Sequence, residues 1–184
     1  MHAIPDSLCY LNGEFGPLAQ ARVSVLDRGF LFGDGVYEAM PVYGRRIFRF
    51  EEHMARLGRS LAKVRIANPL GSAEWLAMCR ELIAAHAADD QLVYLQVTRG
   101  VAPRDHAMPV DVTPTVFAMT SPLRAPTAEQ RHHGVECVTA RDFRWERADI
   151  KSISLLGNVL ARQMSVDHGG ETGGSVREPG YGGR

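Results

Sequence analysis

The chain has 184 residues, no net charge at pH 7, and ordinary shares of hydrophobic (45%) and charged (23%) residues, which is typical of a globular protein. The balanced charge argues against nucleic acid as the main partner, because phosphate binding favours an excess of Lys and Arg. No apolar run approaches the roughly 18 residues that a membrane span needs, and the first residues lack the pattern of a signal peptide.

Two hairpins are predicted near the start of the chain. Asn12-Gly13 separates Leu8–Leu11 from Glu14–Phe15, and this dipeptide readily takes the positive φ angles of a tight turn. A second hairpin is predicted from strands at Val36–Tyr43 and Ile47–Phe50, which flank a glycine-containing turn.

Two helices and two strands are predicted next. Apolar residues recur at helical spacing from Met54 to Val64, and Asn68-Pro69 is expected to end that helix. Ser72 is expected to cap a second helix. The apolar stretches Leu92–Thr98 and Thr115–Thr120 indicate strands that are buried in a sheet.

The fold class is predicted to be α+β, with a complete small N-terminal α/β domain and only the start of a truncated, β-rich second domain. Two prolines and a polar stretch mark a linker between them. The last residues are rich in glycine and poor in apolar side chains, so we expect them to be disordered. The expected limits are 1–120 for the first domain, 121–133 for the linker, 134–169 for the second domain and 170–184 for the tail.

Within the second domain, a strand is predicted at Val135–Ala140 and a helix at Leu155–His168, closed by two glycines. The three cysteines, Cys9, Cys79 and Cys137, are widely spaced and show no metal-binding pattern. We therefore expect no metal site, and free thiols in a protein of the reducing cytoplasm.

Lys151 is the first candidate functional residue. It is one of two lysines in the chain, and it lies in the apolar stretch Asp149-Ile-Lys-Ser-Ile-Ser-Leu-Leu-Gly-Asn158, whereas Lys63 lies on a predicted surface helix. Apolar surroundings favour the neutral amine, which is the nucleophilic form that attacks carbonyl groups. The alternative is a structural lysine that pairs with Asp149.

Three further segments carry candidate residues, each with a structural alternative. Arg104 and His106 lie on a loop after a strand and could hold a carboxylate, although a solvated loop would look the same. The segment Asp27–Glu38 contains three glycines and Tyr37, which indicates a tight turn or a close approach to a ligand. Arg56 lies one turn into a helix, where the alternative is a surface ion pair.

Taken together, these segments resemble the fold-type IV family of pyridoxal-phosphate enzymes, closest to D-amino-acid transaminases. The matching stretches run in the family's order and spacing from about Tyr10 to Gly169. They are Asp27-Arg-Gly-Phe-Leu-Phe-Gly-Asp-Gly-Val-Tyr-Glu, Glu52-His-Met-Ala-Arg-Leu, Gln96-Val-Thr-Arg-Gly, Arg104-Asp-His and the Lys151 stretch.

The resemblance implies a role for five residues. Lys151 is expected to bond the pyridoxal 5'-phosphate cofactor covalently and then to move the substrate α-proton. Arg56 is expected to bind the cofactor phosphate. Tyr37, Arg104 and His106 are expected to bind the substrate α-carboxylate, with the arginine and histidine contributed by the partner subunit of a homodimer. The implied reaction is transamination between a D-amino acid and a 2-oxo acid, with neither nucleic acid nor membrane as a partner.

The sequence also departs from the family. Relatives carry a glutamate for the pyridine nitrogen in a Thr-Glu-Gly segment roughly 30 residues beyond the lysine, and phosphate-binding turns later still. This chain ends at Arg184, and Glu178 is a weak echo of that glutamate which falls short of the expected spacing. We therefore expect weak or no activity from this chain by itself. The alternatives left open are an aminodeoxychorismate lyase, a branched-chain aminotransferase, and a non-catalytic remnant.

Overall fold

The structure is a computed structural model, and it describes residues 7–135, 139–140, 149–167 and 176–177. By their contacts these residues form two units. The first contains the chain up to Leu123 together with Asp149–Ser154, and the second contains the remainder from Arg124 onward. The domain limits expected from the sequence stay predictions, and each unit is described by itself below.

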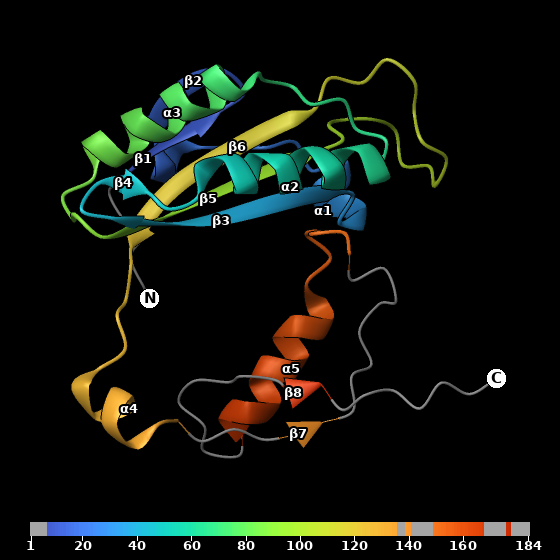
Figure 1. Cartoon of the computed structure of the whole chain (residues 1–184). Helices are drawn as coiled ribbons and strands as arrows, with labels where there is room; N and C mark the ends of the chain where they lie inside the picture. The colour runs from blue at the N-terminus through green and yellow to red at the C-terminus, as the bar shows by residue number, and fades with distance from the viewer. Residues whose placement is uncertain (1–6, 136–138, 141–148, 168–175, 178–184) are drawn as a thin grey trace. The chain divides into compact units, whose positions relative to one another are not determined.

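A six-stranded antiparallel sheet forms the first unit, with strand order β2-β1-β6-β5-β3-β4 (Figure 1). The central strand β5 pairs along its whole length with β3 on one side and β6 on the other. The strands are β1 (Leu8–Leu11), β2 (Glu14–Pro17), β3 (Gly35–Tyr43), β4 (Arg46–Ile47), β5 (Gln91–Thr98) and β6 (Thr115–Pro122).

Both predicted hairpins are present, because their turn residues take positive φ angles. Asn12 and Gly13 have φ of 51° and 101°, and Gly44 and Arg45 have φ of 51° and 61°, as two-residue hairpin turns require. The predicted limits of the second hairpin are wrong at its end, however. Its strand β4 ends at Ile47, and the positive φ of Arg49 (53°) turns the chain into helix α2 at Phe50.

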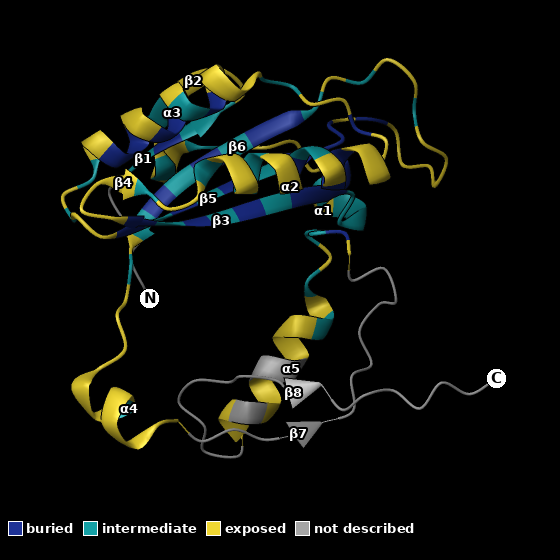
Figure 2. Ribbon diagram, in the orientation of Figure 1, coloured by how far each residue is buried: buried dark blue, intermediate teal, exposed yellow. Residues whose placement is uncertain are grey.

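Helices α2 (Phe50–Lys63) and α3 (Ser72–Ala85) cover one face of the sheet, as Figure 1 shows. Figure 2 shows the buried residues of the strands and of these helices facing one another. Along the central strands β3, β5 and β6, buried residues alternate with less buried ones, so that alternate side chains enter this core. The largest fully buried apolar side chains are Trp75, Met40, Leu57, Leu61, Leu82, Leu95, Val36, Val42, Val93 and Val97. The α+β prediction is therefore confirmed.

The short helix α1 (Arg28–Phe32) is fixed at the end of the sheet by the buried carboxylate of Asp27. This carboxylate accepts hydrogen bonds from Gly29 N (2.8 Å), Thr98 Oγ1 (3.1 Å) and Thr115 Oγ1 (2.6 Å). One buried acid thus caps the helix and joins it to β5 and β6. A 3₁₀ turn, η1 (Leu18–Gln20), precedes it.

The second unit contains α4 (Ala128–His133), α5 (Leu156–Asp167), and the short parallel strands β7 (Thr139–Ala140) and β8 (Val176–Arg177). Helix α4 lies in the predicted linker and was missed, although Thr127 and Gln130 form a capping box that signals a helix start. Helix α5 confirms the predicted one. Of the expected tail, only Val176–Arg177 is described. Among the described residues, no helix combines the length and hydrophobicity needed to cross a membrane.

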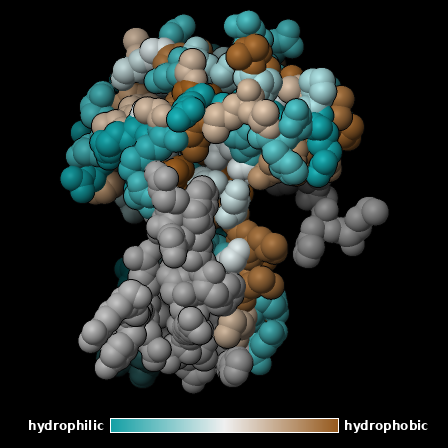
Figure 3. Space-filling view, turned by 90° about the vertical axis from the view of Figure 1, so that its right-hand side faces the viewer, coloured by the Kyte–Doolittle hydropathy of each residue, from teal (hydrophilic) through white to brown (hydrophobic). Residues whose placement is uncertain are grey.

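Apolar side chains on α5 are exposed. Leu156, Val159 and Leu160 are 72%, 60% and 48% exposed, and Figure 3 shows apolar side chains gathered on the described part of the second unit. Residues three and four apart lie on the same face of a helix. The helix therefore presents an apolar face at the surface of the described residues.

Candidate active site

The segment that carries Lys151 pairs with the beginning of strand β3. Tyr37 N donates to Lys151 O (3.0 Å) and Ile153 N donates to Gly35 O (3.1 Å), and Ser152 forms an antiparallel bridge with Val36. These main-chain bonds set Lys151 beside Tyr37, although the two residues are far apart in the sequence. The sequence suggested that both were important but did not show that they were neighbours.

The Lys151 amine lies over an aromatic ring. Its Nζ is 3.7 Å from the centroid of the Tyr37 ring, which attracts the amine when it is protonated. The Tyr37 ring stacks on Tyr94 (5.7 Å between centroids, 30° between planes), and Tyr94 donates a hydrogen bond to Gln96 (2.8 Å). Burial, and to a smaller extent the nearby Tyr37, raises the pKa of Tyr94. The half-buried amine therefore rests on a supported aromatic surface.

Arg56 forms a two-point ion pair with the fully buried Glu38 of β3. Its Nε and NH2 donate to the two carboxylate oxygens at 2.7 and 2.6 Å, and these bonds raise the pKa of Arg56. His53 Nδ1 lies 2.8 Å from the same carboxylate. The Arg56 side chain is 45% exposed, and neither bond to Glu38 uses NH1. The guanidinium is thus held in place, and its NH1 makes no hydrogen bond to the described residues, so it can bind an anion.

Helix α2 brings Arg56 and Lys151 to the same side of the first unit. Ser60 follows Arg56 by one helical turn, so the two share a helix face. The Ser60 hydroxyl accepts a hydrogen bond from the main chain of Lys151 (3.4 Å). The carboxylate of Asp149, the partner proposed for a structural lysine, is engaged by Lys63.

Arg104 and His106 lie together on a second aromatic ring, that of Phe32 at the end of α1. The Arg104 guanidinium is 5.4 Å from the ring centroid, and the two rings of Phe32 and His106 are 5.5 Å apart. Tyr37, the third residue expected at the substrate carboxylate, contacts Lys151 and Tyr94 instead. Within one chain, the expected site residues therefore form two groups.

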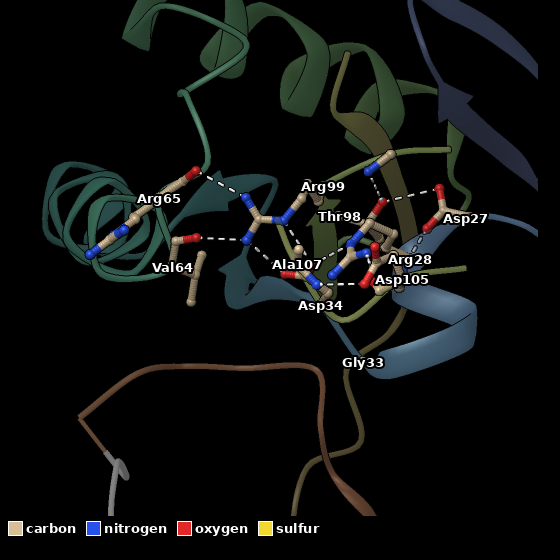
Figure 4. A network of polar contacts seen from close by, with 12 residues as sticks. Asp27, Arg28, Gly33, Asp34, Val64, Arg65, Thr98, Arg99, Asp105 and Ala107 are labelled. Carbon is tan, nitrogen blue, oxygen red and sulfur yellow. Dashed lines mark hydrogen bonds and ion pairs between the residues drawn. The ribbon is translucent and has the colours of Figure 1, made fainter. Parts of the chain in front are cut away.

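Two acidic residues that pair with arginines near the candidate site, Glu38 and Asp34, were not predicted from the sequence. Glu38 lies in β3 at an alternating position between the buried Val36 and Met40. A charged residue at a core position requires a partner, and that signal was available in the sequence. Asp34 likewise binds two arginines, as Figure 4 shows.

The sequence model of the family described as amino-transferase class IV matches residues 35–180, which is most of the chain. The chain belongs to the class IV aminotransferase family. The family predicted from the sequence motifs is thereby confirmed.

Named relatives of this class IV chain include a D-alanine aminotransferase from Bacillus licheniformis. It is 43% identical over 156 residues, which cover 85% of this chain and 55% of the relative. The chain therefore spans a little over half the length of the curated relatives it matches.

Solved structures show that this class IV chain shares its fold with known aminotransferases. The branched-chain amino acid aminotransferase of Escherichia coli superposes with a TM-score of 0.80 at 21% identity, over 94% of this chain and 60% of that one. A hypothetical aminotransferase from Mycobacterium tuberculosis, in a form described as PLP-bound, gives 0.76 at 23% identity, over 95% and 63%.

Proposed function

We propose that this chain is part of a pyridoxal-phosphate-dependent aminotransferase that exchanges the amino group between a D-amino acid and a 2-oxo acid. The observation that carries the proposal is the position of Lys151. Its amine lies 3.7 Å from the centroid of the Tyr37 ring, and its main-chain N–H donates to Ser60 on the helix that presents Arg56. The relatives named D-alanine aminotransferase support the D-amino acid.

The described residues fit this cofactor chemically. Lys151 offers an amine for its aldehyde, and Arg56 offers a guanidinium for its phosphate. The Glu38 carboxylate binds two nitrogens of Arg56. Because the guanidinium is planar, this pairing also fixes the direction of the third nitrogen, NH1. When bound, pyridoxal phosphate supplies the electron sink for the reaction.

The chain's own residues then have distinct tasks. Lys151 would hold the cofactor through its side-chain amine and, as a neutral amine, would move the proton at the substrate Cα. Arg104 and His106 of one chain, with Tyr37 of its partner, bind the substrate carboxylate in the expected homodimer. This division agrees with the two separate groups seen within one chain, since Arg104 and His106 contact Phe32 and Tyr37 contacts Lys151.

Covalent labelling tests the cofactor site without relying on activity. The protein is incubated with pyridoxal phosphate, reduced with borohydride and digested, and the labelled peptide is identified by mass spectrometry. We expect the label on Lys151 and its loss in Lys151→Ala. Lys63, the other lysine in the chain, provides the matched control, since Lys63→Ala should keep the label. A label that distributes equally over both lysines would count against the proposal.

Substrate assays separate the related activities. Because this chain by itself is expected to be weakly active at most, we expect only slow formation of pyruvate from D-alanine with 2-oxoglutarate as acceptor, and still slower reaction of L-leucine or aminodeoxychorismate. A chain that takes up the label at Lys151 but converts none of these substrates would be a binding remnant rather than an enzyme.

The expected compartment remains the cytoplasm. Cys9 and Cys79 are both free and buried, in keeping with a reducing environment, and Cys137 lies outside the described residues. Separating cell fractions and following the protein by immunoblot would test this location.

A further inference from the structure

The loop that carries Arg104 and His106 is held by side chains rather than by regular secondary structure. Its main-chain carbonyl at Asp105 accepts a hydrogen bond from Arg28 NH1 (2.6 Å). The Arg28 guanidinium also lies 4.7 Å from the Phe32 ring centroid. This is the same ring that Arg104 and His106 contact. Arg28 thus holds both the main chain of the loop and the ring on which its functional side chains rest.

Arg28 is in turn fixed by a buried carboxylate, as Figure 4 shows. Its Nε donates to Asp34 Oδ2 (2.8 Å), and the Arg28 side chain is only 4% exposed. Asp34 accepts two further bonds from Arg99, from Nε at 2.7 Å and from NH2 at 2.9 Å. The two-point pair with Arg99 fixes the Asp34 carboxylate. Arg28 then bonds this fixed carboxylate through Nε and the Asp105 carbonyl through NH1, so its position is tightly defined.

The cluster also reaches the helix that carries Arg56. Arg99 donates to the carbonyls of Val64 (2.7 Å) and Arg65 (3.0 Å), which follow the last residue of α2. Asp34 therefore connects the loop after β5 to the end of α2. Buried ion pairs such as those of Asp34 with Arg28 and Arg99 usually add little net stability. We therefore infer that this cluster serves to place the loop after β5 relative to the end of α2.

We propose that Arg28, fixed by Asp34 and Arg99, is a positioning residue for the substrate-carboxylate site of Arg104 and His106. This inference rests on the proposed function for the role of that site. Arg28 touches the loop and not the substrate, so its effect is on where the two side chains lie.

Substituting Arg28 by lysine separates positioning from stability. The lysine keeps the charge opposite Asp34, but an ammonium lacks the planar fork that reaches Asp34 and Asp105 at once. Phe32→Leu removes the ring and leaves the charged cluster intact. Arg45 is the matched control, because it also pairs with an aspartate and donates to main-chain carbonyls, at Ile83, His86 and Ala87.

Nuclear magnetic resonance of the side chains gives a readout that does not depend on activity. In the unmodified protein the Phe32 ring should displace the resonances of the Arg104 side chain and the His106 ring from peptide values. In Arg28→Lys we expect them to return toward peptide values while the resonances of the rest of the first unit stay in place, which shows that the fold is kept. Unchanged resonances in Arg28→Lys would overturn the inference.

Pyruvate titration followed on the same resonances connects positioning to binding. We expect Arg28→Lys and Phe32→Leu each to raise the dissociation constant about tenfold, as misplacement of binding groups by a fraction of an ångström does. Arg45→Lys should not alter it. If pyruvate leaves the unmodified protein's Arg104 and His106 resonances unchanged, the proposed carboxylate site fails, while the ring-induced displacements still decide whether Arg28 positions the loop.

Discussion

Replacing Asp34 with asparagine removes the carboxylate that pairs with both Arg28 and Arg99. The side chains of these three residues are 15%, 4% and 7% exposed, so water compensates little of the lost charge. Removing one partner of a buried ion pair costs about 3–5 kcal/mol. We place Asp34→Asn at the lower end, about 3 kcal/mol, because both arginines keep hydrogen bonds to main-chain carbonyls. The melting temperature should fall by about 6–12 °C.

The effect of this substitution should depend on pH. Burial by itself would raise the pKa of Asp34, but the hydrogen bonds and charges of Arg99 and Arg28 outweigh it and lower that pKa. A carboxyl group with a lowered folded-state pKa stabilises the protein above its unfolded-state pKa, at about 4. That stabilisation disappears as the pH falls through the folded-state pKa. The difference between the unmodified protein and Asp34→Asn should therefore be full at neutral pH and shrink in acid.

Thermal and urea unfolding followed by circular dichroism measure this difference across a pH series. Asp89→Asn is the matched control, since Asp89 pairs with Arg45 at the surface, where the side chains are 76% and 42% exposed. That pair should contribute less than about 1 kcal/mol. The reasoning is refuted if Asp34→Asn is no more destabilising than Asp89→Asn, or if its effect does not change between neutral pH and acid.

Three further predictions concern other parts of the chain. A Cβ on Gly35 would lie 2.6 Å from the Val97 carbonyl oxygen, whereas one on Gly16 would meet nothing within 4 Å. Gly35→Ala should therefore lower the free energy of unfolding by about 1–3 kcal/mol. Gly16→Ala should change it far less, and urea unfolding measures both. Burial raises the pKa of Cys79 to about 12 and raises that of Cys9. Iodoacetamide at pH 8 should thus label neither thiol until the protein unfolds, as peptide mass spectrometry can verify. Leu156 is 72% exposed, so Leu156→Ser should reduce the fluorescence of bound anilinonaphthalene sulfonate, and an unchanged signal would place the apolar surface elsewhere.

The fold of the first unit was largely predictable because its signals are local. A continuous apolar stretch located β5, a glycine-containing turn located β3 and its hairpin, and the turn at Asn12-Gly13 identified the first hairpin through its backbone preference. The ends of strands and helices were less predictable where the conformation of a single residue changes the direction of the backbone. Arg49 takes a positive φ of 53° before α2, and nothing in an arginine side chain announces that conformation.

The candidate site was predictable as a set of residues but not as an arrangement. Lys151 and Tyr37 were both singled out, yet their contact depends on main-chain pairing between segments more than a hundred residues apart. Arg56 was expected either at a cofactor phosphate or in a surface ion pair. The structure pairs it with the buried Glu38, which a helix-surface pattern does not reveal because the partner belongs to a strand.

The two acids of this region explain why tertiary structure was needed. Asp34 lies just before β3 and Glu38 lies within it, and each is bound by an arginine from outside the strand. A buried carboxylate must be paired, so the sequence does predict that partners exist. It does not say which ones, because 21 lysines and arginines are available and only the folded chain brings a particular one within reach. Ion pairs therefore join β3 and the residue before it to two other parts of the chain. Glu38 binds Arg56 of α2, and Asp34 binds Arg28 and Arg99. A substitution at either acid should disturb the element it holds more than it disturbs β3.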